Sequence, residues 1–159
     1  VGRLDLASTG LLLLTNDTRL ADWLTDPANR VVRRYLVTVR GQLDGDVVER
    51  LEAGIDDRGE RLTASHVAVR KRSGRETHLV VELVEGRNRE IRRMFRALGR
   101  DVTRLKRVAF AGIELGNLAP GRWRHLAADQ LRDSGPLTRN ARQRDPTRNR
   151  SRAQQPNNF

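Results

Sequence analysis

Four consecutive leucines at positions 11–14 place the strongest constraint on how this chain can fold. An apolar run of this length, closed by Thr-Asn-Asp, predicts a strand that is buried on both faces. Asp5 lies shortly before the run, in a loop that is bracketed by Gly2 and Gly10. A carboxylate this close to a buried strand is costly to desolvate unless a cation lies beside it. The chain is therefore expected to supply a cationic partner for Asp5.

The rest of the sequence alternates between helical and extended patterns. Apolar spacing and end signals predict helices at 18–26, 46–53 and 88–98. Alternating and β-branched runs predict strands at 33–40, 65–72, 77–84, 102–108 and 112–115. The short turn at Ser73-Gly74 favours an antiparallel hairpin between the two strands that flank it.

Composition favours a nucleic-acid partner. The formal net charge is +11, and arginine far outnumbers lysine; the planar guanidinium fork suits phosphates and base edges. No long apolar span or basic amphipathic anchor favours a membrane. The absence of cysteine excludes disulfides, zinc ribbons and thiol catalysis. No signal peptide is visible, so a cytoplasmic location is expected.

The chain is predicted to divide into one folded domain and a tail. Residues 133–159 are rich in Arg, Asn, Gln and Pro and contain almost no apolar residues, which predicts a disordered basic tail. Residues 1–132 are long enough to bury a core of their own. The tail is expected to add non-specific affinity for RNA.

The excess positive charge of the folded part is concentrated in residues 85–107, which carry a net charge of +6. On a helical wheel of about 100° per residue, Arg92 lies at the seam between the apolar and basic faces. It can turn inward without leaving its helix, so it is the predicted partner of Asp5. The remaining arginines fit either a solvated helix face or phosphate contacts, and their clustering without compensating glutamates favours phosphate. The basic face holds Arg89, Arg93 and Arg96.

Other catalytic chemistries find little support. The three histidines, at positions 66, 78 and 125, lack the spacing of metal ligands. Ser8 has neither a nucleophile-elbow context nor an evident histidine partner. The acid pairs Asp56-Asp57 and Asp44/Asp46 are interpreted as ordinary loop residues. Asp5 is left as the one acid in an unusual setting, with a loop-capping role as its alternative.

Four stretches, in the right order, resemble the ribosomal RNA pseudouridine synthases of the RsuA/RluB branch. The first is Gly-Arg-Leu-Asp at 2–5 with Ser-Thr-Gly-Leu-Leu-Leu-Leu-Thr-Asn-Asp at 8–17, and the second is Arg-Arg-Tyr at 33–35. The third begins with Glu-Gly-Arg-Asn-Arg-Glu-Ile-Arg-Arg-Met-Phe at 85–95 and continues through Leu98, Gly99, Val102, Leu105 and Arg107. Leu-Ala-Pro-Gly-Arg-Trp-Arg-His-Leu at 118–126 closes the likeness.

The resemblance implies an α+β fold with a mixed, largely antiparallel sheet flanked by helices. It also implies an isomerase that converts a uridine of ribosomal RNA to pseudouridine after flipping the nucleotide out of its stack. No cofactor or metal is implied. Ribosomal RNA or a pre-ribosomal particle is the expected partner, no membrane is expected, and the chain is expected to be a monomer. The alternative is an RNA-binding module without activity; a generic DNA-binding protein has less support.

Residue by residue, the resemblance implies three catalytic residues. Asp5 matches the essential aspartate, which either attacks the sugar or removes its C2′ proton. Tyr35 matches the tyrosine that stacks on the uracil, and Arg92 matches the basic partner of the aspartate. Arg3 matches the residue that helps to hold the flipped nucleotide, and Leu105 an apolar residue of the base pocket. Further RNA contacts are expected from Arg87, Arg89 and Arg93.

Two departures from the family pattern affect expectations. Thr18 stands where the family usually has glycine, which is expected to alter a turn rather than the site. The upstream strand and the S4 RNA-binding domain of many relatives are not in this sequence. An open sheet edge is therefore expected beside the site.

Overall fold

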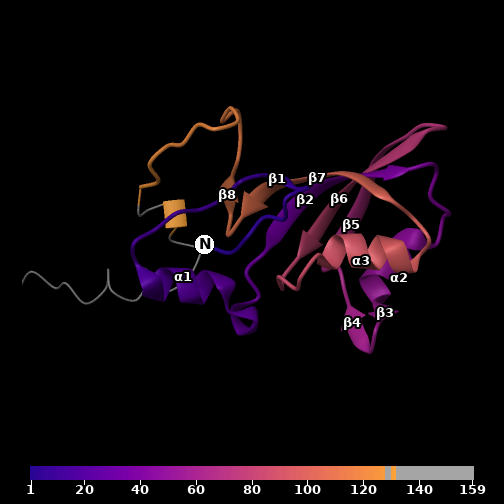
Figure 1. Ribbon diagram of the computed structural model, residues 1–159, viewed down its shortest axis with the longest axis horizontal. Coiled ribbons are helices and arrows are strands. Elements are labelled where there is room, and N and C mark those ends of the chain that lie inside the picture. Colours follow the sequence, from indigo (N-terminus) through magenta and orange to yellow (C-terminus); the bar gives the residue numbers. More distant parts are fainter. Residues whose placement is uncertain (128–129, 132–159) are drawn as a thin grey trace, which may run out of the picture.

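The structure is a computed structural model that describes residues 1–127 and 130–131 (Figure 1). The predicted tail at 133–159 lies outside these residues, so the domain boundary at 132 stays a prediction. None of the described helices is long and apolar enough to cross a membrane.

The fold is built on one mixed sheet, and the predicted α+β class is confirmed. Strand β7 (Val102–Phe110) pairs in parallel with the edge strand β1 (Thr9–Gly10) and antiparallel with β2 (Arg33–Arg40). The order continues through β6 (Glu76–Leu83) to β5 (His66–Arg72), again antiparallel, while β8 (Ile113–Glu114) pairs with β7. Because β1 ends this order, the expected sheet edge is present within the described part of the chain.

Three helices form close to their predicted positions: α1 (Thr18–Thr25), α2 (Val47–Ala53) and α3 (Glu90–Ala97). Asp17 caps α1 by accepting a hydrogen bond from the Leu20 amide at 3.2 Å, and a 3₁₀ turn, η1 (Pro27–Asn29), follows. A glycine in the left-handed region, Gly99, comes just after α3, as the sequence pattern predicted.

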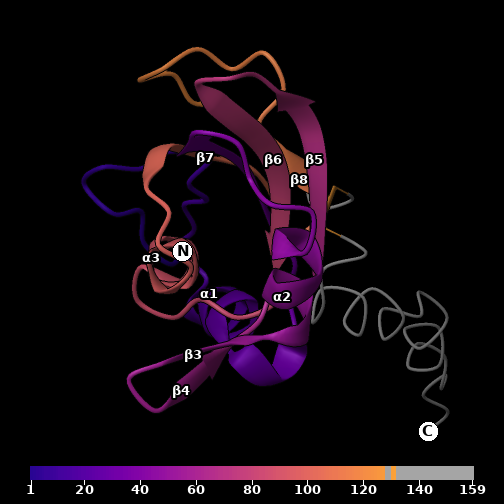
Figure 2. The ribbon, with the colours of Figure 1, turned by 90° about the vertical axis from the view of Figure 1, so that its right-hand side faces the viewer.

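A small hairpin, β3 (Ile55–Asp57) and β4 (Glu60–Leu62), was not predicted. Its turn residues, Arg58 and Gly59, both have positive φ, as a tight two-residue hairpin turn requires. Arginine is not the usual choice at such a position, so the turn signal was missed. The hairpin projects from the helix side of the sheet and contacts α3 (Figure 2).

The larger core lies between one face of the sheet and helices α2 and α3, which lie on the same side of it (Figure 1). Alternate residues of the central strands point into this core, among them Val37 and Val39 of β2. The apolar face of α3 packs against them through Ile91, Met94 and Phe95. Tyr35 lies at the margin of the core, on the face predicted from strand alternation.

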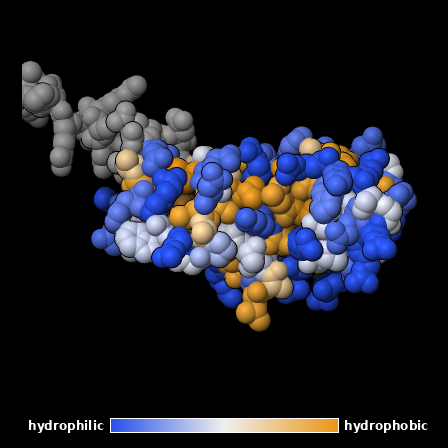
Figure 3. Space-filling view, turned by 90° about the horizontal axis from the view of Figure 1, so that it is seen from above, coloured by the Kyte–Doolittle hydropathy of each residue, from blue (hydrophilic) through white to orange (hydrophobic). Residues whose placement is uncertain are grey.

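A second core lies around α1 and corrects the prediction for the leucine run. Leu11 and Leu13 are buried in this core, but Leu12 is 44% exposed and Leu14 82% exposed. The run therefore buries one face rather than two, and the strand preceding it, β1, is only two residues long. On the face seen from above, apolar side chains are interspersed with polar ones (Figure 3).

Candidate functional site

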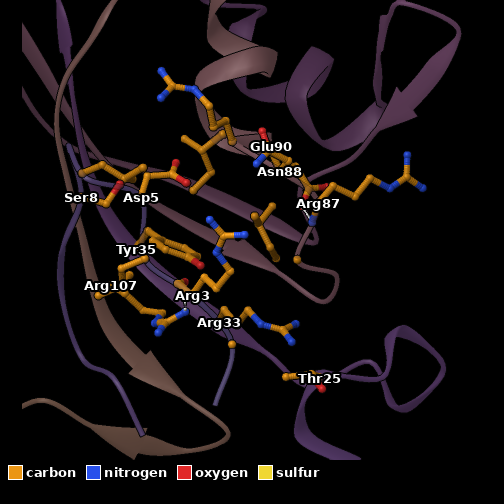
Figure 4. A pocket seen from close by; sticks show the side chains of 17 residues that line it. Arg3, Asp5, Ser8, Thr25, Arg33, Tyr35, Arg87, Asn88, Glu90 and Arg107 are labelled. Atoms are coloured by element: carbon orange, nitrogen blue, oxygen red, sulfur yellow. Dashed lines mark hydrogen bonds between the residues drawn. The ribbon is translucent and has the colours of Figure 1, made fainter. Parts of the chain in front are cut away.

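Two of the three predicted catalytic residues, Asp5 and Tyr35, line one cavity of about 330 Å³, whereas Arg92 is not among its lining residues. Asp5 from the N-terminal loop, Tyr35 from β2 and Leu105 from β7 all line it. Figure 4 shows the Asp5 carboxylate and the Tyr35 ring facing the same space. Residues far apart in the sequence therefore share one cavity. Its basic lining residues include Arg3, Arg87 and Arg89.

Asp5 is carried by a tight turn that is held at both ends. The Ser8 amide donates a 2.8 Å hydrogen bond to the Asp5 carbonyl, which closes the turn. The chain then enters β1, where Gly10 lies against Arg107 of β7. A Cβ atom at Gly10 would lie 2.1 Å from the Arg107 carbonyl oxygen, so no other residue fits. Backbone pairing with β7 thus positions the Asp5 turn over the sheet.

Arg92 lies beside this turn, but it does not form the predicted ion pair with Asp5. Its guanidinium donates to the carbonyl oxygens of Ala7 at 2.7 Å and Val102 at 2.9 Å. Partial burial and repulsion by Arg89 lower the pKa of Arg92, and attraction by Asp5 opposes them. Among the described residues, no nitrogen of Arg92 lies within 4.0 Å of the Asp5 carboxylate. Arg92 therefore anchors the turn through the Ala7 carbonyl group, near Asp5.

One side of the cavity, called the apolar wall below, consists of Tyr35, Leu83, Ile91 and Leu105. Three of these side chains belong to the larger core, and Tyr35 packs against it. Leu105 is buried and pairs across the sheet with Val37, two residues beyond Tyr35 on the same face of β2. An aromatic ring beside aliphatic groups is suited to holding a planar base.

Two buried arginines, Arg33 and Arg107, form another side of the cavity, and sequence analysis noted them only as parts of motifs. They are 6% and 2% exposed, and each guanidinium lies about 5 Å from the centre of the Phe110 ring, at 4.9 and 5.0 Å. Burial, with a contribution from Arg107, lowers the pKa of Arg33. Their hydrogen bonds connect β2 and β7 to helix α1 and to neighbouring loops.

The hydrogen bonds of this buried arginine pair reach main-chain carbonyl groups. Arg33 donates to Leu24 at 3.0 Å and Val31 at 3.1 Å. Arg107 donates to Leu11 at 2.8 Å and Arg3 at 3.4 Å. Arg107 therefore ties both ends of the Asp5 loop to the sheet. No pattern in the sequence predicts this arrangement, because the arginines contact carbonyl groups from distant segments of the chain.

Glu90, the first residue of α3, is a buried acid that lines the cavity and was also missed. Its side chain is 3% exposed, and one carboxylate oxygen accepts a 3.2 Å hydrogen bond from the Arg87 amide. Within the described residues, no donor contacts the other oxygen, and the Glu85 carboxyl group is close enough to share a hydrogen bond with the protonated Glu90 side chain. Burial, followed by repulsion from Glu85, raises the pKa of Glu90 to about 7. From sequence alone, Glu90 fits an ordinary first-turn acid.

The arginines predicted to contact RNA differ in their surroundings. Arg89 is exposed at the start of α3, with no hydrogen bond or ion pair from its side chain within the described residues. Arg87 donates to the Glu85 carboxylate and to the Arg61 carbonyl, both at 2.9 Å. Arg93 forms ion pairs at 2.6 Å with Asp57 and Glu60.

The ion pairs of Arg93 correct two interpretations of the sequence. Asp57 was interpreted as an ordinary loop residue, but it lies in β3 and pairs with α3. Arg93 was placed on the basic face that was predicted to contact RNA phosphates, but its guanidinium forms ion pairs with the unpredicted β3–β4 hairpin. Its guanidinium is already occupied within the protein.

Within the described residues, no group of three or more His, Cys, Asp or Glu side chains could hold a metal ion. His66 lies 3.5 Å from Glu52, and His78 lies 3.2 Å from the Thr38 hydroxyl. These histidines are separate from the cavity.

Comparison with known proteins agrees with this geometry. The family model described as RNA pseudouridylate synthase matches residues 1–97. An uncharacterized RNA pseudouridine synthase of Aquifex aeolicus is 37% identical, over 82% of this chain and 53% of the relative. The ribosomal large subunit pseudouridine synthase B of Yersinia pestis is 39% identical, over 84% of this chain and 43% of the relative.

A solved structure supports the same assignment. A crystal structure of pseudouridylate synthase superimposes with a TM-score of 0.74 at 29% identity and covers 83% of this chain and 57% of that chain. The chain spans about half the length of the first curated relatives it matches. Because the family model covers more than half of the sequence, the chain belongs to the RNA pseudouridylate synthase family.

Proposed function

We propose that this chain isomerises a uridine of ribosomal RNA to pseudouridine, with Asp5 acting on the flipped-out nucleotide. The observation that carries the proposal is the meeting of Asp5, Tyr35 and Leu105 at one cavity. The names of relatives such as the Yersinia pestis protein make large-subunit ribosomal RNA the first substrate to test.

The proposed reaction breaks the N1–C1′ bond, turns the uracil, and forms a C5–C1′ bond; C5 loses its proton and N1 takes one up, so the product is an isomer of uridine. No electrons are gained or lost, so the step needs a positioned carboxylate and a pocket that holds the detached base. Asp5 supplies the carboxylate, either as nucleophile at the sugar or as base at C2′. Tyr35 stacks on the uracil and Leu105 closes the pocket beside it.

The basic residues take different roles in this proposal. Arg92 keeps the Asp5 turn in place through the Ala7 carbonyl. Arg3, Arg87 and Arg89 line the cavity and are exposed, which suits contacts with RNA phosphates. Arg93, also predicted to contact RNA, is held in ion pairs with the β3–β4 hairpin, which favours a structural role. The predictions of a monomer and of a cytoplasmic location stay predictions.

Release of tritium from C5-labelled uridine tests the reaction directly, because isomerisation frees the C5 proton. Wild-type protein is incubated with unmodified large-subunit ribosomal RNA, and Asp5→Asn is compared with Asp22→Asn, an exposed acid of α1 outside the cavity. We expect release from wild type and Asp22→Asn and none from Asp5→Asn, with RNA binding retained by all three. Release by Asp5→Asn would remove the assignment of Asp5.

A non-catalytic RNA-binding module is the second candidate, and one observation favours it. Arg92 binds two carbonyl groups rather than the Asp5 carboxylate, so the two charges are not paired directly. In that case the wild-type chain would bind RNA with a steep salt dependence and release no tritium.

A further inference from the structure

The turn that carries Asp5 presents a second side chain to solvent. Leu6, the next residue, is 106% exposed and does not line the cavity. Asp5 faces the cavity (Figure 4). Consecutive Cα atoms are about 3.8 Å apart, so the apolar side chain stands one backbone step from the candidate catalytic carboxylate.

Rigid anchoring distinguishes Leu6 from an ordinary exposed leucine. Single apolar residues are common on protein surfaces and need no explanation. Here, however, the turn is closed by the hydrogen bond from the Ser8 amide to the Asp5 carbonyl, at 2.8 Å. Arg92 holds the following carbonyl, that of Ala7, at 2.7 Å. The backbone on both sides of Leu6 is therefore fixed, while its side chain is fully exposed and packs on none of the described residues.

The surrounding residues leave this apolar side chain in a basic setting. Arg3 and Arg89 line the nearby cavity and are exposed, so an RNA strand is favoured electrostatically at its mouth. Proteins that distort nucleic acids often insert an apolar side chain, leucine included, between adjacent bases.

We propose that Leu6 enters the RNA stack at the place left by the target uridine while that nucleotide occupies the cavity with Asp5. Leu6 is then a positioning residue: it favours the flipped-out state and takes no part in the bond changes. This inference rests on the proposed function. It predicts that Leu6 matters for a stacked uridine and not for one that is already unstacked.

The test uses the hairpin of large-subunit ribosomal RNA that the full wild-type chain binds most tightly. One form keeps its uridine paired, with 2-aminopurine beside it, whose fluorescence rises when stacking is lost. A second form places the same uridine in an unpaired loop. The fluorescence rise on binding and the rate of tritium release from C5 are measured for both forms.

The variants are Leu6→Ala, Leu6→Met and Leu14→Ala, since Leu14 is also strongly exposed but does not belong to the turn that carries Asp5. We expect Leu6→Ala to lose most of the fluorescence rise and to release tritium at least tenfold more slowly from the paired form. On the unpaired form it should stay within twofold of wild type. Leu6→Met and Leu14→Ala should behave as wild type on both.

The outcomes separate this inference from the proposed function. Equal fluorescence and equal tritium release for Leu6→Ala and wild type on the paired hairpin overturn the role of Leu6. The same conclusion follows if Leu6→Ala slows tritium release equally on both forms, or if wild type produces no fluorescence rise. A rise that depends on Leu6 but comes with no tritium release supports the role of Leu6 and overturns the isomerase.

Discussion

The cavity is built differently on two of its sides. The apolar wall belongs to the larger core, where side chains pack without direction-dependent bonds. The buried arginine pair lies against Phe110 of the second core and fixes its neighbours through hydrogen bonds to carbonyl groups. In the proposed function, the first side holds the base and the second positions the loop that carries Asp5.

The difference indicates where the site tolerates change. A packed wall can absorb a small loss of volume, because its contacts are many and individually weak. A loop that is held by a few buried hydrogen-bond donors tolerates less change, because removal of one donor leaves buried acceptors without a partner. Substitutions on the arginine side should therefore have larger effects than those on the apolar wall.

The largest effect is expected for Arg107→Met, which removes the donors to Leu11 and Arg3. Each buried hydrogen bond from a charged group contributes roughly 1.5–3 kcal/mol, so we expect about 3 kcal/mol lower stability and loss of activity. Urea denaturation and tritium release measure the two quantities. Arg104→Met, an exposed arginine on the same strand, is the control for stability. Equal effects of the two substitutions would end the distinction between the two sides.

Arg92→Met and Arg93→Met form the next comparison, since these neighbours differ in what they hold. Arg92 binds the Asp5 turn, and Arg93 binds the β3–β4 hairpin. Arg92→Met should cost about 1 kcal/mol of stability, and of the two substitutions we expect only Arg92→Met to lower kcat, by roughly 100-fold. Tritium release under saturating RNA gives kcat. A comparable loss of kcat in Arg93→Met would show that the hairpin, too, positions the site.

Glu90→Gln tests the one buried acid of the cavity, through the pH dependence of stability. The pKa of Glu90 is about 7 in the folded chain, above its usual 4.5, so the folded state holds a proton that the unfolded state loses between these values. Below the lower pKa, Glu90 is protonated in both states and does not change the free energy of unfolding. Above the higher pKa, its ionised form is buried in the folded state and lowers the free energy of unfolding by the full amount. A glutamine keeps an acceptor for the Arg87 amide without the charge.

Accordingly, Glu90→Gln should raise stability by up to about 3 kcal/mol at pH 8 and leave it nearly unchanged at pH 4. Thermal unfolding across this pH range measures the gain. Glu49→Gln, in the exposed first turn of α2, should show no such trend. A gain for Glu90→Gln that is equal at both pH values would mean that burial of Glu90 acts through packing rather than through its proton.

Sequence reasoning predicted the elements that depend on local patterns. The bounds of β2, the Asp17 cap of α1, the glycine just after α3, and the apolar face that places Ile91 and Phe95 in the core all follow from spacing and end signals. Sequence reasoning was wrong where the partner of a side chain depends on a contact between distant segments. Arg92 was expected to reach Asp5, but the Ala7 carbonyl takes its guanidinium. Arg107 and Glu90 became visible as parts of the cavity only when distant segments came together.

The smallest effect is expected on the apolar wall. Leu105→Val removes one methylene group from a buried residue of the larger core that lines the cavity. Such a deletion costs about 1 kcal/mol, and the surrounding aliphatic side chains can close part of the space. Tritium release should fall by no more than about fivefold, because the ring of Tyr35 still covers one face of the base.

Leu79→Val provides the matched control, since Leu79 lies in the same core but does not line the cavity. Its loss of stability should equal that of Leu105→Val, and its activity should match wild type. A 100-fold loss of activity in Leu105→Val with this small loss of stability would contradict the comparison. The apolar wall would then require as precise a geometry as the arginine pair, and the two sides of the cavity would be equally sensitive despite their different construction.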